Sequence, residues 1–124
     1  MRFGILGPLA AWRGGEPVEV GGLRVRMLLA LLLLDAGRTV SSARLIDEIW
    51  AESPPAGAAN ALQSLVSRLR AAVRPAAVEL APGGYRLAVE PEAVDAHRFE
   101  RLAAEGRRAL AGGDPELAAF AELL

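Results

Sequence analysis

The amino-acid sequence predicts an α+β fold, and three stretches carry this prediction. Residues 23–36 form a leucine-rich run of helical length, and residues 60–74 repeat apolar side chains with the period of a helix. Residues 78–89 alternate apolar and polar side chains around a glycine turn, which is typical of a β-hairpin. Short alternating segments near the N-terminus add strands ahead of both helices.

The composition places this fold in a soluble protein. Hydrophobic residues make up 52% of the 124 positions, which is enough for one domain with a core and a small appendage. The absence of cysteine excludes disulfides, cysteine-ligated zinc and a thiol nucleophile. The longest apolar run, Met27–Leu34, is too short to span a bilayer, and no signal peptide precedes it. We therefore expect a cytoplasmic protein with no membrane partner.

The charge is divided unevenly along the chain. Residues 1–89 hold ten arginines against seven acids, or +3, whereas residues 90–124 hold four arginines against eight acids, or −4. The sum is the net charge of −1. A basic N-terminal part and an acidic C-terminal part predict two units with different roles, which we place at residues 1–90 and 91–124.

The N-terminal part predicts a small antiparallel sheet followed by a buried helix. Three short strands fall around residues 3–5, 9–11 and 18–20, and we expect them to support the core. The helix at 23–36 is apolar nearly all round, so it is expected to be the central buried helix, ended by Gly37 at its C′ position.

A second helix follows a short extended link. The link covers Arg38–Val40, and either Ser41 or Ser42 supplies the N-cap of a helix that ends at Trp50. Its apolar residues recur on one side, so we expect one buried face. Trp50 is interpreted as a core residue rather than as a stacking platform.

The third helix, over residues 60–74, has two unlike faces. The apolar stripe is Leu62, Leu65, Val66, Leu69 and Val73. The polar side, with its flank, is Asn60, Gln63, Ser64, Ser67, Arg68, Arg70 and Arg74. This side has no acid and offers the amides, hydroxyls and guanidiniums that read base edges and bind phosphates. An ordinary amphipathic surface helix is the alternative interpretation of the same pattern.

The order of elements narrows the fold. A stiff loop at 51–57 joins the second helix to the third, Pro75 ends the third helix, and a hairpin turning at Pro82-Gly83-Gly84 follows. Two helices joined by a short loop, the second with a cationic outer face and a hairpin after it, are the layout of a winged helix-turn-helix. The hairpin is the expected wing.

The C-terminal part predicts the beginning of a helical unit. After a linker at residues 90–93, Asp95 is expected to cap a helix through Ala111, which Gly112–Pro115 interrupts. A further helix is predicted at 116–124. Small residues at the contact positions resemble a tetratricopeptide-type pair, and one such pair cannot bury its own face. We therefore expect a truncated unit, with further helical repeats following in the native protein.

Taken together, these stretches resemble the Streptomyces antibiotic regulatory protein family. The resemblance lies in MRFGILGPL at 1–9, LLALLLLDAGR at 28–38, RLIDEIW at 44–50, Pro54-Pro55, NALQ at 60–63, VSRLR at 66–70 and Gly84-Tyr85. The segments VDAHRF at 94–99 and GGDP at 112–115 resemble the start of that family's bacterial transcriptional activation domain. The resemblance runs over almost the whole chain in the right order.

The resemblance implies an OmpR-type winged helix, like the effector domains of two-component systems, that activates transcription of antibiotic and other secondary-metabolite clusters. It implies double-stranded DNA as partner, bound by two copies on tandem direct repeats, with a homodimer on DNA possible. The matching DNA-contact positions are Asn60, Gln63, Ser64, Ser67, Arg68 and Arg70, with Arg68 in the major groove. The loop from Glu52 to Gly57, with Glu52, Ser53, Pro54 and Pro55 as its candidate residues, matches the segment that faces RNA polymerase or its sigma factor in OmpR-type activators.

Other arginines are expected on phosphates, and the wing departs from the family pattern. The phosphate candidates are Arg24, Arg26, Arg38, Arg44, Arg70, Arg74 and Arg86. Ala81 stands where many OmpR-type wings carry arginine before the Gly-x-Gly-Tyr turn. Arg86 either substitutes for that arginine or points along its strand to solvent.

No catalytic function is expected. His97 is the only histidine, and no spacing suggests a triad, a carboxylate pair, a metal site or a phosphate-binding glycine loop. We therefore expect no enzyme activity, no metal and no cofactor. The alternative to DNA binding is a winged helix kept as a protein-interaction module, with the acidic back half bound to a partner.

Overall fold

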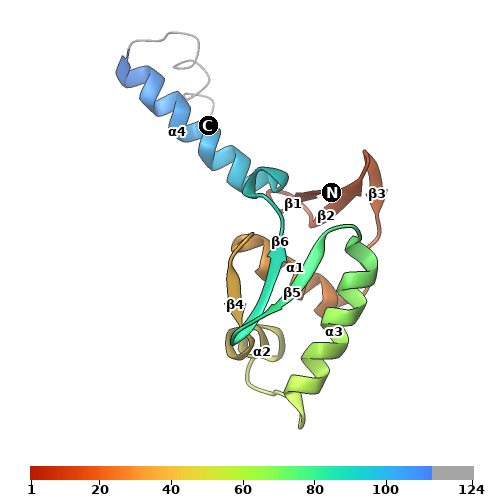
Figure 1. Cartoon of the computed structure of the whole chain (residues 1–124). Helices are drawn as coiled ribbons and strands as arrows, with labels where there is room; N and C mark the ends of the chain where they lie inside the picture. Colours follow the sequence, from red (N-terminus) through yellow and green to blue (C-terminus); the bar gives the residue numbers. More distant parts are fainter. Residues whose placement is uncertain (113–124) are drawn as a thin grey trace.

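The computed structural model of the chain describes residues 1–112 and has the predicted α+β class (Figure 1). Its elements are β1 (Arg2–Gly4), β2 (Ala10–Arg13), β3 (Glu16–Val18), α1 (Leu23–Leu34), β4 (Thr39–Ser41), α2 (Ser42–Trp50), α3 (Ala58–Val73), β5 (Ala77–Ala81), β6 (Gly84–Ala88), a 3-10 turn (Pro91–Ala93) and α4 (Asp95–Gly112). The helix predicted at 116–124 lies outside the described residues.

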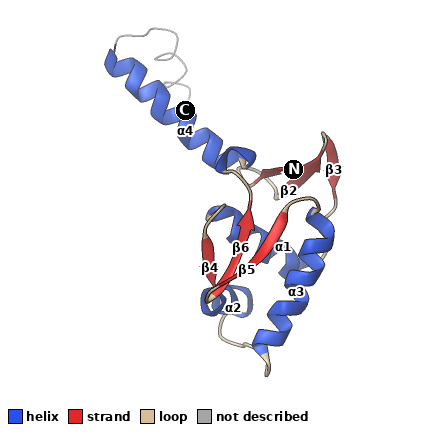
Figure 2. Ribbon diagram, in the orientation of Figure 1, coloured by secondary structure: helices blue, strands red, loops and turns tan. Residues whose placement is uncertain are grey.

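Two antiparallel sheets flank the helices. The N-terminal sheet is antiparallel, as predicted, and has the order β1-β2-β3, although its third strand covers Glu16–Val18 rather than residues 18–20. The second sheet has the order β4-β6-β5, so the predicted hairpin forms its β5–β6 half. Figure 2 shows this sheet beside α1 and α3, with the N-terminal sheet at the opposite end from α2.

The segment predicted as an extended link is a strand of the second sheet. In β4, Val40 pairs with Tyr85 of β6. The two strands approach so closely that a Cβ built on Gly84 would lie 2.0 Å from the carbonyl oxygen of Val40. Only glycine fits there, which gives the Gly84-Tyr85 pair of the sequence a steric role in the fold.

Helix α1 is the centre of the core, as predicted. Leu28, Leu29, Leu32 and Leu33 are completely buried, and α1 contacts α2, α3 and β6. Burying a leucine side chain stabilises a fold by about 1.5–3 kcal/mol, so this leucine run is a major source of stability. The helix ends two residues earlier than predicted, and Gly37 follows in a left-handed conformation.

Helix α2 begins at the predicted serine cap. The Oγ of Ser41 accepts a hydrogen bond from the backbone N–H of Arg44 at 3.1 Å, which selects Ser41 over Ser42 as the cap. Leu45 and Ile49 are buried on the side that packs against the core. The expected single apolar face is therefore confirmed.

Helix α4 is attached to the N-terminal sheet at its first turn and then leads away from the body (Figure 1). Phe3 forms a parallel bridge with Val94, and the carboxylate of Asp95 accepts the backbone N–H groups of Ile5 at 2.8 Å and Leu6 at 3.2 Å. The helix begins at Asp95 itself, and the same carboxylate also accepts the backbone N–H of Ala96 at 2.7 Å, so Asp95 both serves the first turn of the helix and ties it to the end of β1. No helix in residues 1–112 is long and apolar enough to cross a membrane.

Candidate nucleic-acid interface

Helix α3 has the two faces that its sequence predicts. The buried side chains are Leu62, Leu65, Val66, Leu69 and Val73. The exposed polar side chains are Asn60, Gln63, Ser64, Ser67, Arg68, Arg70 and Arg74. Because residues 53–78 contain no acid, the outward face of this helix is polar and carries only positive charge.

The loop before α3 fixes where the helix starts. Gly57 is the N-cap in a left-handed conformation with φ of 70°, and its carbonyl oxygen accepts the N–H groups of Asn60 and Ala61. This conformation favours glycine because it carries no Cβ. The loop residues Glu52, Ser53, Pro54 and Pro55 are all exposed, so the predicted polymerase-facing segment lies at the surface beside the start of α3.

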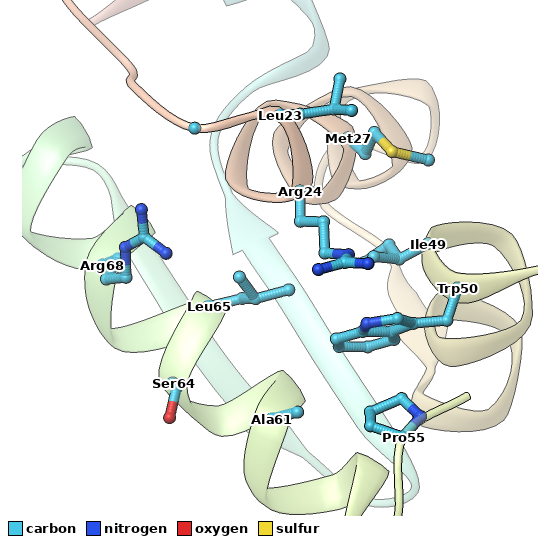
Figure 3. A pocket seen from close by; sticks show the side chains of 11 residues that line it. Leu23, Arg24, Met27, Ile49, Trp50, Pro55, Ala61, Ser64, Leu65 and Arg68 are labelled. Carbon is cyan, nitrogen blue, oxygen red and sulfur yellow. The ribbon is translucent and has the colours of Figure 1, made fainter. Parts of the chain in front are cut away.

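One flank of the outward face borders a groove of about 730 Å³ between α1, α2 and α3 (Figure 3). Ser64 and Arg68 line it from α3, and Trp50 lines it from α2. Trp50 is half-buried, so it packs on the core as predicted but also presents part of its ring to this groove. Its place at the end of a helix just before the proline loop is the sequence signal that could have shown this second role.

Two arginines line this groove. The guanidinium of Arg24 lies 5.7 Å from the centre of the Trp50 ring, within the range of a cation–π interaction. Arg68 reaches the start of α1, where a Cβ on Gly22 would lie 2.9 Å from its Nη2. Gly22 has a φ of 91°, which favours glycine, and the end of the Arg68 side chain lies against it, a contact that the sequence did not reveal. Two cations, a half-buried indole and Ser64 are gathered here.

The opposite flank borders the hairpin. Gln63, Ser67 and Arg70 line a crevice with Leu80 and Tyr85 of the β5–β6 hairpin. The Nε of Arg70 donates a hydrogen bond to the carbonyl oxygen of Val78 at 2.8 Å. Arg70, which we expected on phosphate, therefore ties α3 to the hairpin. Arg74 is exposed at the C-terminal end of α3, next to the outward face of the helix.

Two other predicted site residues are not gathered with α3. Arg44 forms an ion pair of 2.9 Å with Asp35, just beyond the end of α1. Arg86 pairs with Glu79 across the hairpin. Since Leu80 and Tyr85 face α3, the alternating side chains of Glu79 and Arg86 point to the other side of the hairpin. Arg26, also a phosphate candidate, instead donates hydrogen bonds to the carbonyl oxygens of Val20 and Leu9.

This arrangement suits contact with a polyanion. Within residues 1–112, the acidic side chains and His97 do not gather into a metal-ligand set. The imidazole of His97 is instead 2.8 Å from the carbonyl oxygen of Leu33, where it links α4 to α1. The candidate site is therefore a surface of hydrogen-bonding groups and arginines.

Comparison with known proteins identifies the family. Residues 16–87, more than half of the chain, match the family described as "Transcriptional regulatory protein, C terminal". The chain is 42% identical over 115 residues to the regulatory protein AfsR of Streptomyces coelicolor, and this alignment covers 92% of this chain and 12% of AfsR. It is 36% identical over 129 residues to the regulatory protein DnrI of Streptomyces peucetius, and this alignment covers 95% of this chain and 47% of DnrI.

A solved structure agrees with these relatives. The structure of Mycobacterium tuberculosis EmbR in complex with a low-affinity phosphopeptide superposes with a TM-score of 0.87 at 35% identity, and the match covers 97% of this chain and 33% of that one. The chain thus spans less than half the length of these relatives. The resemblance to the Streptomyces antibiotic regulatory proteins and the winged-helix fold are confirmed. The chain belongs to the OmpR-type family of transcriptional regulatory protein C-terminal domains.

Proposed function

We propose that this chain is the sequence-specific DNA-binding unit of a transcriptional activator. Helix α3 enters the major groove, and the β5–β6 hairpin lies as a wing over the adjacent backbone. One observation carries this proposal: Asn60, Gln63, Ser64, Ser67 and Arg68 are all exposed on one face of α3, and none of these side chains hydrogen-bonds within residues 1–112. Their polar groups are therefore free to bind a ligand.

The side chains of this face match the chemistry of base edges. Arg68 donates in parallel to O6 and N7 of guanine, and the amides of Asn60 and Gln63 fit N6 and N7 of adenine. Each such bidentate contact discriminates against the wrong base by about 1–3 kcal/mol. Ser64 and Ser67 donate to or accept from either kind of base.

The remaining arginines supply phosphate contacts. Arg24 lies beside the flank of α3 that carries Ser64 and Arg68, Arg74 follows the C-terminal end of α3, and the two Nη nitrogens of Arg70 remain available for phosphate. Arg44 and Arg86 reach phosphate by leaving their exposed carboxylate partners. Exposed ion pairs are worth only about 0–1 kcal/mol, so this exchange is easy. Each phosphate contact adds about −0.9 to the slope of log affinity against log salt concentration.

Two copies bind together on tandem direct repeats about one helical turn apart. A charge of +3 on residues 1–89 is modest for a DNA-binding protein, so a single copy binds weakly. A second copy one turn away lies on the same side of the duplex and forms a homodimer on DNA. The direct orientation is proposed from the family resemblance.

The exposed loop at Glu52, Ser53, Pro54 and Pro55 contacts RNA polymerase or its sigma factor. The loop joins α2 to α3, so a bound α3 holds it at a fixed distance from the promoter DNA. Two prolines limit its conformations and so lower the entropy lost on contact. Residues 1–90 form the DNA-binding unit, residues 91–124 begin an activation unit, and the controlled genes form a secondary-metabolite cluster.

Footprinting on the promoters that neighbour the gene tests this function. We expect two protected sites about one helical turn apart on one side of the duplex. A salt titration with nonspecific duplex distinguishes the alternative: a steep loss of affinity with salt supports DNA binding. A flat response together with no protected site contradicts the proposal and favours a protein-interaction module.

A further inference from the structure

A hollow of about 320 Å³ lies where the first turns of α4 meet the N-terminal sheet (Figure 1). Three of the six large apolar side chains that are exposed within residues 1–112 line it: Leu6 at 59%, Phe99 at 38% and Trp12 at 36%. Leu102 and the buried Phe3 complete its apolar lining. Single exposed apolar side chains are common, whereas a contiguous cluster of them marks an interaction site.

The two exposed aromatic rings of the hollow come from different elements that the fold holds together. Trp12 is on β2, and its ring lies against Gly4 of β1, where an added Cβ would be 3.1 Å from Cη2 of the ring. Phe99 is in the second turn of α4, and Asp95 at the start of that helix accepts the backbone N–H of Ile5. Because these contacts fix both walls, the hollow exists before a ligand binds, which lowers the entropy lost on binding.

The charged side chains of the hollow leave two cations for a ligand. Its two acids are already engaged, because Glu92 pairs with Arg101 and the carboxylate of Asp95 accepts backbone N–H groups. Its two arginines, Arg2 and Arg98, are exposed, and their guanidiniums make no hydrogen bond or ion pair within residues 1–112. Guanidiniums bind carboxylates through two parallel N–H donors, so a carboxylate is the group that suits this lining.

We propose that this hollow is a binding site for a small aromatic carboxylate. The ring enters between Trp12 and Phe99, and the carboxylate accepts hydrogen bonds from Arg2 and Arg98. A volume of about 320 Å³ suits a small molecule, whereas a stable protein interface buries about 800 Å² on each partner. The size therefore favours a free small molecule over a partner protein. The site does not involve α3, so the proposal does not rest on the proposed function.

An NMR titration of the isotope-labelled 124-residue chain with 2-naphthoate tests the site. The indole N–H signal of Trp12 and the amide signal of Phe99 should shift saturably. The indole signal of Trp50, which lines the groove beside α3, should not shift. The neutral alcohol 2-naphthylmethanol should bind about tenfold more weakly, the equivalent of one hydrogen bond to a charged group. Acetate, which has the charge without the ring, should cause no saturable shift.

Replacing the arginines tests the partners of the carboxylate. In the double variant Arg2→Gln/Arg98→Gln, naphthoate and naphthylmethanol should bind with the same affinity. The control Arg107→Gln, at an exposed arginine of α4 outside the hollow, should keep the tenfold difference. If the wild type binds both compounds equally, if Trp50 shifts as Trp12 does, or if Trp12 shows no saturable shift, the proposal is overturned. DNA binding is measured separately with a duplex, so the proposed function can stand when this site fails.

Discussion

Arg13, at the end of β2, donates a hydrogen bond from Nη2 to the carbonyl oxygen of Ala72 at 3.0 Å and so joins the N-terminal sheet to the last turn of α3. The Nε of the same guanidinium donates to the carbonyl oxygen of Arg74. The last carbonyls of a helix have no partner within it, so a side chain from elsewhere can satisfy them. The N-terminal sheet, which we expected only to support the core, thereby also positions the proposed recognition helix.

Replacing Arg13 should loosen that end of α3. Arg13→Ala removes both hydrogen bonds, and because the site is exposed we expect the free energy of unfolding to fall by only about 1 kcal/mol. Urea denaturation measures the change. Arg38→Ala, which removes an exposed arginine without such bonds among residues 1–112, is the matched control, and an equal effect of both substitutions would argue against the role of Arg13.

The contact of Gly84 with β4 predicts a larger effect. In Gly84→Ala the new Cβ meets the backbone of Val40, which cannot turn away as a side chain does, so the β4–β6 pairing must open. We expect a loss of about 1–3 kcal/mol or more in unfolding free energy, as for other overpacked sites. Thermal denaturation compares it with Gly7→Ala, where a Cβ meets nothing within 4 Å. Similar stability of the two variants would show that β4 does not pack as described.

Asp95 should control the attachment of α4 to the N-terminal sheet. Asp95→Ala leaves the backbone N–H groups of Ile5 and Leu6 without their carboxylate partner. Amide hydrogen exchange at these two residues should accelerate, and the unfolding free energy should fall by about 1–3 kcal/mol. Glu100→Ala, an exposed acid in the same helix, should change neither quantity. Unchanged exchange at Ile5 would show that the carboxylate is not what holds the end of β1.

The first turns of α4 should become less stable at acid pH. A hydrogen bond from Arg101 holds the pKa of the Glu92 carboxyl below its usual value of 4.5, and Arg101 also pairs with Glu105 at 2.7 Å. A carboxyl whose pKa is lowered in the folded state contributes stability above its unfolded pKa, and this contribution is lost as pH falls through the folded pKa.

An NMR titration of the Glu92 carboxyl measures this effect. The pKa should lie below 4.5 in the wild type and return toward that value in Arg101→Ala. Salt should weaken the effect because the pair is exposed. The same pKa in both proteins would contradict the hydrogen bond between the two side chains.

The elements predictable from sequence were those with a local signal. The period of α3, the cap at Ser41 and the glycine turn of the hairpin each depend on residues close together in the chain. Strand β4 was missed because it is three residues long and exists only through pairing with β6, more than forty residues later. No local pattern distinguishes such a segment from an extended link.

The arginines show the same division within the candidate site. The exposure of Arg68 follows from helical periodicity, so sequence placed it on the correct face. The roles of Arg13, Arg26 and Arg70 depend on carbonyl oxygens that folding brings near them, and every residue type supplies the same carbonyl. Local sequence therefore offers no means to separate structural arginines from those proposed to contact DNA.

The central claim is that the outward face of α3 reads bases, and the ratio of affinities for cognate and scrambled duplexes tests it most directly. Arg68→Ala should reduce this ratio by the equivalent of about 1–3 kcal/mol, because it removes a base contact. Arg74→Ala should weaken both duplexes alike and reduce the salt slope by about 0.9, and Arg108→Ala on α4 should change neither. If Arg68→Ala keeps the wild-type ratio, Arg68 does not read bases and the proposed role of this face is contradicted.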